Sequence, residues 1–349
     1  MKPVRYAVVG SGAIATTHAR AIAEAERSEL AAIWGRDAGR SQALADEHGV
    51  DFSTDIEKLA SRDDIHAATI ATPSGAHEVF AIPFLKRGKA VLCEKPMEIR
   101  LDRIDRMVAA ADEHGAILAG VFQMRLGAGA QALKKAVESG RFGRLTLCSG
   151  ELRWWRDQDY YDSVGWRGTK EFDGGGALMN QGIHLVDLLQ WIAGMPCEVS
   201  ANTALLAHRD IEVEDTVSAS LRFPGGALGT IEAATSCRPG SAMRLSISGD
   251  RGSAVLENDK IVFWRFDEEG EEDDAIRAQA AGLITGGASS PKVADVTGHR
   301  LLVEDLSTSI QEGRLPAIDG KEARRAVELI LAIYESARLR EFVRSYETR

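Results

Sequence analysis

The chain has 349 residues, more than one ordinary hydrophobic core accommodates, so two domains are expected. Its composition, 44% hydrophobic and 27% charged, is that of a globular protein, and its formal net charge of -10 argues against a nucleic-acid partner. The four cysteines form no C-x-x-C pair, and no long uncharged apolar stretch is present. We therefore expect a cytoplasmic protein with reduced thiols, no signal peptide before the strand that follows Arg5, and no contact with a membrane.

Up to about Phe122, short apolar runs alternate with amphipathic stretches of helical spacing. Strands are expected at Tyr6–Val9, Leu30–Trp34, Ala67–Ala71, Ala90–Cys93 and Ile117–Val121. Helices are expected between them, at Ala13–Ala25, Arg40–His48, His77–Lys86 and Asp102–His114. This alternation predicts βαβ units, and so a Rossmann-type, doubly wound parallel sheet over residues 1–122.

After Arg125 the pattern changes to a helix, at Ala130–Ser139, and then to long alternating strands. These strands are expected at Arg144–Trp155, Val199–Leu206, Asp215–Phe223, Ala227–Thr235, Arg244–Gly249, Ser253–Glu257 and Lys260–Phe266. Further helices are expected at Gly175–Ile192, Arg300–Glu312 and Lys321–Arg340, and the acidic run Asp267–Asp274 is expected to be a solvated loop. Residues 123–349 thus predict a second α/β domain with a large open, mostly antiparallel sheet, whose last helix packs back on the first domain.

A glycine-rich turn, Gly10-x-Gly12-x-x-Ala15, follows the first strand and opens the first helix. Gly10 permits the tight turn, and Gly12 lets the backbone approach a pyrophosphate. The amides of Ala13 and Ile14 at the helix start, together with the helix dipole, are expected to hold the phosphates. The alternative is a tight strand–helix turn without a ligand; the surrounding α/β pattern favours a dinucleotide site.

The end of the second strand bears on the choice between NAD and NADP. NAD-selective sites place an acidic residue there, whereas this chain has Gly35 followed by Arg36. Gly35 is expected to leave space for a phosphate and Arg36 to pair with it, which favours NADP over NAD. Asp37 lies further on and is expected to cap the next helix.

Cys93-Glu94-Lys95-Pro96 stands at the carboxyl end of a buried strand, the edge at which open α/β sheets bind ligands. Pro96 restricts the preceding residue, so Lys95 is aimed rather than trailing in solvent. Lys95 is expected to contact a substrate hydroxyl and to stabilise the developing alkoxide; a structural ion pair with Glu94 is the alternative.

His184 is the best candidate for the base that accepts the hydroxyl proton, because an ordinary imidazole titrates near neutral pH. On an α-helix Asn180, His184 and Asp187 lie at i, i+4 and i+7 and share a face. Asp187 then orients the imidazole or pairs elsewhere, and Asn180 and Asp187 are both expected to bind substrate. The alternative for His184 is a hydrogen-bonded core histidine. No further ligands complete a metal site, so catalysis without a metal is expected.

In these motifs the chain resembles the Gfo/Idh/MocA family of oxidoreductases. The similarity runs along nearly the whole chain and includes the glycine turn, Thr72-Pro73-Ser74-Gly75-Ala76-His77, Cys93-Glu94-Lys95-Pro96, Gln123-Met124-Arg125, Gly174-Gly175-Gly176 leading to His184, and Leu315–Gly320 before a long helix. The resemblance implies hydride transfer at a hydroxyl-bearing carbon of a sugar, polyol or sugar derivative. It also implies cofactor contacts from Thr72, Pro73, His77, Glu94, Lys95 and Gln123, and a substrate contact from Arg125.

One position departs from the family pattern. Many polyol dehydrogenases of the family carry aspartate four residues before the helix histidine, and this chain has Asn180, which cannot accept a proton. The run Asn180–His184, after Trp166-Arg167-Gly168-Thr169, is closer to the branch acting on sugar-nucleotide uronic acids. Trp166 and Arg167 belong to a group of aromatic residues and arginines that suits a sugar face and an anionic group, or else packing at an oligomer rim.

We therefore predict an NAD(P)-dependent oxidoreductase acting on a secondary hydroxyl or ketone of a sugar, polyol or sugar derivative. Two alternatives stay open: an NADPH-dependent reductase of ketosugars or other carbonyls, and a non-catalytic dinucleotide-binding sensor. The uncharged alternation of Asp215–Phe223 and Ala227–Thr235 further predicts a homodimer or homotetramer that forms through the open sheet.

Overall fold

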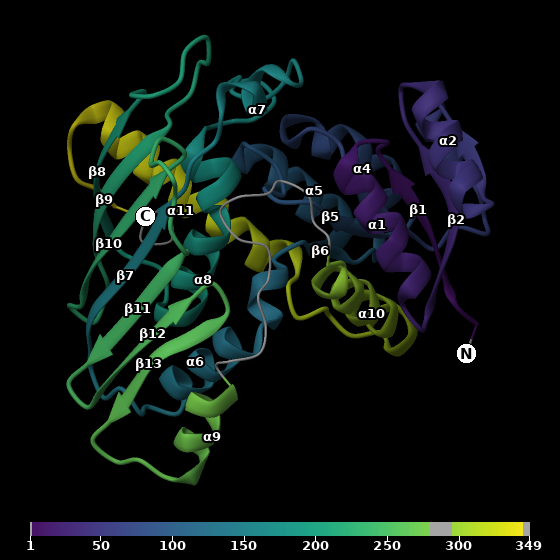
Figure 1. Ribbon diagram of the computed structural model, residues 1–349. Coiled ribbons are helices and arrows are strands. Elements are labelled where there is room, and N and C mark those ends of the chain that lie inside the picture. The colour runs from purple at the N-terminus through teal and green to yellow at the C-terminus, as the bar shows by residue number, and fades with distance from the viewer. Residues whose placement is uncertain (1, 280–294, 345–349) are drawn as a thin grey trace. The chain divides into compact units, whose positions relative to one another are not determined.

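The computed structural model describes residues 2–279 and 295–344 of the chain (Figure 1). The chain forms two compact units. The first comprises Met1–Gln123 and Lys292–Arg324, and the second comprises Met124–Pro291 and Arg325–Arg349. A segment near the C-terminal end of the sequence therefore completes the N-terminal unit.

The first unit is built on a parallel sheet of six strands in the order β3-β2-β1-β4-β5-β6. Its strands are β1 (Val4–Val9), β2 (Ser28–Trp34), β3 (Asp51–Ser53), β4 (Ala67–Ile70), β5 (Ala90–Cys93) and β6 (Leu118–Gly120). Every residue of β4 and β5 is buried, which explains why these strands appear in the sequence as continuous apolar runs. The predicted parallel sheet is confirmed, with the short edge strand β3 as an addition.

Helices connect these strands as the right-handed crossover of parallel sheets requires. They are α1 (Ala13–Glu24), α2 (Ala38–His48), α3 (Ile56–Ala60), α4 (His77–Leu85), α5 (Leu101–His114) and, from the later segment, α10 (Thr297–Glu312). Helix α10 packs on α1 and is fastened to β1, because the Tyr6 hydroxyl lies 2.8 Å from Ser307 Oγ in the buried core.

The second unit contains an eight-stranded sheet in the order β13-β12-β11-β7-β10-β9-β8-β14. Its strands are β7 (Leu145–Arg153), β8 (Glu198–Ala204), β9 (Thr216–Arg222), β10 (Leu228–Ala234), β11 (Arg244–Gly249), β12 (Gly252–Glu257), β13 (Lys260–Phe266) and β14 (Val343–Arg344). Neighbouring strands are antiparallel except for β7 and β10, which are parallel. The expected open, mostly antiparallel sheet is confirmed.

Helices pack against this sheet and leave part of it uncovered (Figure 1). They are α6 (Ala128–Glu138), α7 (Gln158–Asp162), α8 (Ile183–Ala193), α9 (Glu271–Gln279) and the part of α11 (Gly320–Leu339) that follows Arg324. Helices α6 and α8 contact each other and the strands β12, β7 and β11. Leu147 on β7 and Leu228 on β10, which face each other in the ladder, are each 51% exposed.

The acidic run corrects one expectation from the sequence. Its second half is the first turn of α9, not a loop, since acidic side chains stabilise the positive end of a helix. Asp273 is buried, and its carboxylate accepts hydrogen bonds from Arg141, from the Trp264 indole and from the Gly270 amide. Within the described residues no helix is long and apolar enough to span a membrane.

Candidate active site

The glycine turn has the geometry that a dinucleotide site needs. Gly10 has φ +141°, and a Cβ there would stand 2.5 Å from the Ala71 carbonyl oxygen, so only glycine fits. Gly12 precedes α1 as its N-cap without a side chain, and a Cβ there would meet no described atom within 4 Å. This open space is compatible with a phosphate at the amide end of α1, and the phosphate contact of Ala13 and Ile14 stays a prediction.

The end of β2 is more crowded than the sequence suggests. The space beside Gly35 is filled by the hydroxyl groups of Ser11 and Ser41, so the room expected there for a phosphate is lined with hydroxyls instead. Arg36 is exposed and, within the described residues, makes no hydrogen bond or ion pair. Asp37 caps α2 by accepting the Arg40 amide at 3.1 Å, which confirms the capping role predicted for it.

The segment between β4 and α4 supports the site indirectly. His77 is buried, and its two ring nitrogens lie 2.9 Å from the carbonyl oxygens of Thr72 and Pro96. The His77 ring therefore lies between this segment and the segment that carries Lys95, and its cofactor contact stays a prediction. Thr72 and Pro73 stand at the carboxyl end of β4, where that prediction places them.

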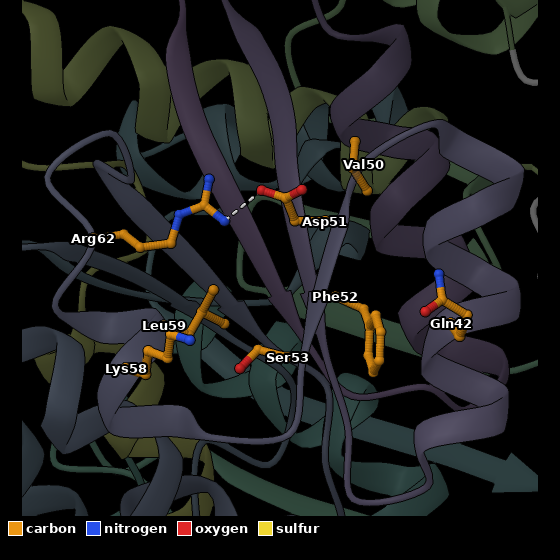
Figure 2. A pocket seen from close by; sticks show the side chains of 8 residues that line it. All are labelled: Gln42, Val50, Asp51, Phe52, Ser53, Lys58, Leu59 and Arg62. Atoms are coloured by element: carbon orange, nitrogen blue, oxygen red, sulfur yellow. Dashed lines mark hydrogen bonds and ion pairs between the residues drawn. The ribbon is translucent and has the colours of Figure 1, made fainter.

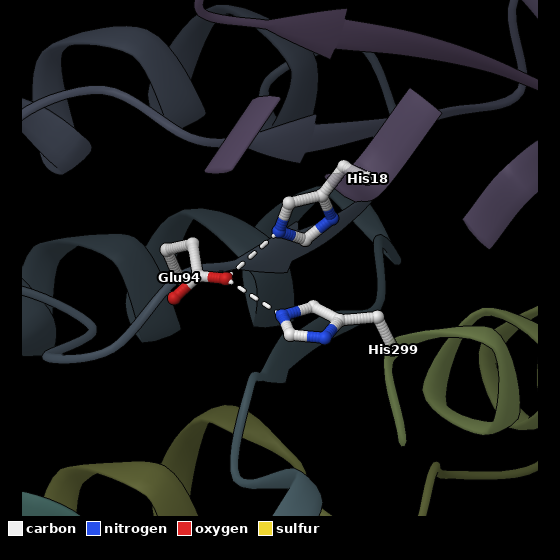
Figure 3. Close-up of side chains that lie close together, drawn as sticks. All are labelled: His18, Glu94 and His299. Carbon is white, nitrogen blue, oxygen red and sulfur yellow. Dashed lines mark hydrogen bonds and ion pairs between the residues drawn. The ribbon is translucent and has the colours of Figure 1, made fainter. Parts of the chain in front are cut away.

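Glu94 is buried between two histidines of the first unit (Figure 3). Its Oε1 lies 2.9 Å from His18 Nε2 and 3.2 Å from His299 Nε2, and its Oε2 accepts the Lys95 amide at 3.1 Å. Burial alone would raise the pKa of Glu94, but the two histidine hydrogen bonds hold it well below its usual range. Both oxygens accept hydrogen bonds within the chain, so Glu94 anchors this segment internally, and its cofactor contact stays a prediction. Lys95 directly follows it and is half-buried.

His184 stands at the second position of α8, immediately after a π-helix at Ala177–Gly182. Asn180 lies inside this π-helix, so the α-helical spacing assumed between Asn180 and His184 is wrong. A carboxylate distant in the sequence, Glu214, accepts the amides of Gly176 and Leu178 at the start of the π-helix. Short π-helical segments are frequent at functional sites.

Close packing before the π-helix requires glycine at three successive positions, Gly174, Gly175 and Gly176. Gly174 has φ +74°. A Cβ at Gly175 would clash with the Tyr334 hydroxyl, and one at Gly176 would clash with the Glu214 carbonyl oxygen. Tyr334 donates to Glu214 Oε1 at 2.9 Å and accepts the Met179 amide at 3.2 Å. The glycines thus leave room for Glu214, from the segment before β9, and Tyr334, from α11, to bind the start of the π-helix.

Asn180 belongs to a network of polar side chains. Its amide nitrogen donates to Asp173 Oδ1 at 2.6 Å, and its Oδ1 accepts Gln181 Nε2 at 2.8 Å. Gln181 also donates to the Tyr160 hydroxyl at 2.9 Å. Asp173 is buried and accepts the Gly168 amide at 2.8 Å. Position 180 thus carries an amide where many polyol dehydrogenases of the family carry an aspartate, but the carboxylate of Asp173 is hydrogen-bonded directly to this amide.

Arg125 and Asp187 were both predicted to contact substrate, and in the structure they bind each other. Arg125 Nε and NH2 lie 2.8 and 2.6 Å from the two oxygens of Asp187, and both side chains are at most 2% exposed. Gln190 also donates to Asp187, at 3.3 Å. This bidentate pair ties the 3₁₀ turn Gln123–Leu126 to α8. Their contact with substrate stays a prediction.

Two arginines flank the Tyr160 ring ahead of the His184 helix. The Arg167 guanidinium lies 4.2 Å from the ring centroid and 5.5 Å from that of Trp166, and the Arg156 guanidinium lies 5.6 Å from the Tyr160 ring. Arg156 is buried, and burial lowers its pKa. No described carboxylate lies within ion-pair distance of Arg167. The segment therefore offers positive charge beside aromatic faces.

The pocket in Figure 2, about 400 Å³ in volume, lies elsewhere in the first unit, beside the edge strand β3. Its lining residues are Gln42, Val50, Asp51, Phe52, Ser53, Lys58, Leu59 and Arg62. None of the predicted site residues is among them, and its only charged contact in the figure is the ion pair between Arg62 and Asp51 at 2.8 Å.

Sequence reasoning missed four residues of these sites: His299, Asp173, Glu214 and Tyr334. Asp173 had a signal, since it directly precedes the three glycines. The other three come from segments more than 30 residues from their partners, as the hydrogen bonds to Glu94, Leu178 and Met179 show. Gln123 was predicted for the cofactor site; it packs against Gly298.

A Rossmann unit with an open glycine turn, joined to a unit with a mixed sheet and a helix-borne histidine, defines an oxidoreductase that binds a nicotinamide dinucleotide. The chain belongs to the Gfo/Idh/MocA family, as its motifs predicted. Residues 4–122 match the model of the family's N-terminal domain, described as "Oxidoreductase family, NAD-binding Rossmann fold". Residues 130–255 match a second model, described as "GFO/IDH/MocA C-terminal domain". It is an NAD-binding enzyme of this family, whose sugar and polyol dehydrogenases are among its relatives.

Three similar proteins illustrate the range of the family. The WlbA dehydrogenase from Bordetella pertussis, solved in complex with NADH and UDP-GlcNAcA, is 35% identical over 98% of each chain with a TM-score of 0.90. The 2,7-anhydro-N-acetylneuraminate hydratase of Mediterraneibacter gnavus is 31% identical over 60% of this chain and only 54% of its own. The trans-1,2-dihydrobenzene-1,2-diol dehydrogenase of Oryctolagus cuniculus is 31% identical over 71% of this chain and 74% of its own.

Proposed function

We propose that the protein oxidises a secondary hydroxyl of a nucleotide-linked uronic acid such as UDP-GlcNAcA, with a nicotinamide cofactor as hydride acceptor. The observation that carries the proposal is the positive, aromatic segment before the His184 helix, where Arg156 and Arg167 flank Tyr160. Guanidinium groups bind carboxylates and phosphates in paired hydrogen bonds, and aromatic faces suit a sugar ring. The WlbA complex with UDP-GlcNAcA supports the same substrate class.

The proposed mechanism assigns one task to each catalytic side chain. A bound nicotinamide dinucleotide would supply the hydride acceptor. His184 in its neutral form accepts the proton of the reacting hydroxyl. Lys95, as an ammonium, donates a hydrogen bond to the same oxygen and stabilises its developing charge. Asn180 and Gln181 present amide groups for neighbouring sugar hydroxyls. The same residues run the reaction in the direction of reduction when the ketone is supplied.

The preference for NADP over NAD remains a prediction within this proposal. Arg36 supports it, as an exposed guanidinium available to a 2′-phosphate, and the hydroxyls of Ser11 and Ser41 are further donors. The Asp37 carboxylate at the start of α2 repels a phosphate and so limits the preference. The WlbA dehydrogenase was solved with NADH, so both cofactors belong in the test.

The test compares UDP-GlcNAcA with UDP-GlcNAc, which differ in the carboxylate of the sugar, each with NAD and with NADP. Nicotinamide absorbance reports net oxidation, and mass spectrometry of the product detects water addition or loss, because one relative is a hydratase. We expect oxidation of UDP-GlcNAcA with kcat/KM about 10–100-fold above that for UDP-GlcNAc, the value of a charged hydrogen bond. Equal rates with both sugars, or turnover of neither, would contradict the proposed substrate.

We also propose that two or four copies associate through the uncovered sheet of the second unit and that the protein is cytoplasmic. Leu147 and Leu228 form an exposed apolar pair on neighbouring strands, and the face they share also carries the short side chains Ser218 and Ser220. Charged side chains lie on it as well, namely Arg222 opposite Leu228 and the ion pair of Arg153 with Glu232. Light scattering at micromolar concentration tests the assembly. A monomer with full activity would remove it, and Leu228→Lys is expected to dissociate it.

A further inference from the structure

The three buried side chains His18, Glu94 and His299 form a cluster whose function the proposed mechanism does not use (Figure 3). They come from α1, from the residue after β5 and from α10, so two histidines 281 positions apart in the sequence (299 minus 18) meet at one carboxylate. The ring centroids of the two histidines are 5.1 Å apart in an edge-to-face arrangement. The carboxylate of this cluster belongs to the residue directly before Lys95.

The contacts assign the protons in this cluster. Both Nε2 atoms lie against the same carboxylate oxygen, so both must carry hydrogen to donate to it. His18 Nδ1 is buried and has no hydrogen-bond partner among the described residues. A proton on that atom would be an unsatisfied buried donor, so His18 is the neutral Nε2–H tautomer. Burial lowers the pKa of His18, in agreement with this assignment.

The same atoms argue against a metal ion, although two imidazoles and a carboxylate within 4.8 Å of one another are a plausible ligand set. A histidine that binds a metal through Nε2 carries its proton on Nδ1 and donates it to an acceptor. For His18 no such acceptor exists in the described part of the chain. The distances of 2.9 and 3.2 Å to Glu94 Oε1 are those of hydrogen bonds.

The cluster also controls the backbone at Lys95. Glu94 Oε1 is held by the two rings, and this leaves Oε2 in place to accept the Lys95 amide at 3.1 Å. On the other side, His77 holds the carbonyl oxygens of Pro96 and Met97 at 2.9 and 3.2 Å. The backbone on both sides of Lys95 is therefore fixed by buried side chains of its own unit.

We infer that His18 and His299 are positioning residues that lock the Glu94 carboxylate and thereby aim Lys95 at the reacting hydroxyl. The inference rests on the role proposed for Lys95. It makes α10, a helix near the end of the sequence, a functional part of the N-terminal unit. Misplacing a catalytic group by about 1 Å costs on the order of 10²-fold in rate, so even a small movement of Glu94 has a measurable effect.

The experiment replaces each histidine in the full chain by leucine, which removes the donor, and by glutamine, which keeps a nitrogen donor near Nε2. We expect His18→Leu and His299→Leu to lower kcat by about 10²-fold with an unchanged KM for the cofactor, and the glutamine variants to recover most of it. The double leucine variant is expected to be no worse than the more severe single one, because both act through one carboxylate.

A pH profile separates this role from simple packing. The donors of His18 and His299 keep Glu94 ionised, so their removal raises its pKa, and the acidic limb of activity moves to higher pH. Two other titratable groups near this carboxylate, His77 and Cys93, are unchanged in the variants, and so is Lys95. A role in packing alone would lower stability without moving this limb.

Ser307→Ala is the matched control, because it removes a buried hydrogen bond of the same helix α10, to Tyr6, far along the helix from His299. It is expected to lower the melting temperature while kcat and the pH profile stay as in the wild type. Leucine variants with wild-type kcat and pH profile would overturn the inference. A divalent metal bound in stoichiometric amount, whose removal by a chelator abolishes activity, would also overturn the inference.

Imidazole 15N spectra of the wild-type protein provide a readout that does not depend on turnover. A proton on Nε2 of both rings, with His18 neutral, supports the cluster as described, and a ring without a proton on Nε2 overturns it. If Lys95→Met were fully active, the proposed function would fail, whereas the spectra would still decide the arrangement of the cluster.

Discussion

The two candidate catalytic side chains stand on different kinds of support. Lys95 follows a buried parallel strand, and side chains of the Rossmann unit hold the backbone on both sides of it. His184 follows a π-helix whose start is held by Glu214 and Tyr334. The support of Lys95 surrounds the short motif Cys93–Pro96, which is visible in the sequence. The support of His184 is built from residues far apart in the sequence, which bind the π-helix.

This difference matches what each side must recognise. The nicotinamide dinucleotide is a standard ligand, and a standard turn at Gly10 and Gly12 suits it. The substrate is particular, and the polar network around Asn180 and Asp173 is correspondingly irregular. Substitutions around the π-helix are therefore expected to change substrate kinetics while cofactor binding stays constant, and substitutions at the end of β2 should do the reverse.

The largest effects are expected from the catalytic side chains themselves. Lys95→Met and His184→Ala should each lower turnover by about 10²–10⁴-fold, the contribution of a positioned acid or base, and leave the cofactor Kd nearly unchanged. In the oxidation direction wild-type activity should rise with pH through the imidazole titration, about 6.5 for an ordinary histidine, because only the neutral ring accepts a proton. Steady-state kinetics and calorimetric titration with NADH measure both quantities.

The control for these variants is His114→Ala, a histidine in the exposed last turn of α5, which should leave turnover unchanged. If Lys95→Met and His184→Ala both retained wild-type turnover, neither side chain would be catalytic. A large loss of cofactor affinity in His184→Ala would instead break the division of tasks between the two units.

The cofactor side can be tested alone at Arg36. Arg36→Ala should weaken NADP binding by about 1–3 kcal/mol, because a charged hydrogen bond to the 2′-phosphate is lost, and leave NAD binding unchanged. Calorimetric titration of both cofactors against wild type and variant gives the comparison. A clear wild-type preference for NAD would reject the NADP prediction. Arg40→Ala, which removes an exposed arginine of the same helix start, is the matched control.

The stability of the second unit depends on a contact that the sequence hid, the buried carboxylate of Asp273. Hydrogen bonds from Arg141 hold its pKa well below the usual value. This contribution is present above the unfolded pKa, about 3.9, and is lost as the pH falls. Asp273→Asn should therefore cost about 1.5–3 kcal/mol at pH 7 and less at pH 3, measured by urea unfolding at both pH values. An equal cost at both pH values would contradict this account.

Features of the structure that depend on residues close together in the sequence could be predicted, and features that depend on distant residues could not. The parallel strands, the glycine turn and the capping role of Asp37 depend on neighbouring residues, and they could be predicted. The π-helix could not, because Glu214 that holds its start is more than 30 residues away, and α-helical spacing was assumed in its place. For the same reason the histidine contacts of Glu94 could not be predicted, since His299 lies 205 positions further along the chain.

The smallest predicted effect tests the support of the π-helix directly. Tyr334→Phe removes one hydroxyl that donates to Glu214 and accepts the Met179 amide, and it keeps the ring in place. A lost buried hydrogen bond costs about 1 kcal/mol of stability. Because the affected turn leads directly to Asn180 and His184, kcat should also fall several-fold, with the cofactor Kd unchanged.

Ser336→Ala is the matched control on α11, since its hydroxyl is buried and accepts the Ala201 amide at 3.0 Å without touching the π-helix. The control should lose similar stability at full kcat; equal kcat in both variants would show that the grip of Glu214 and Tyr334 on the π-helix serves the fold and not the reaction.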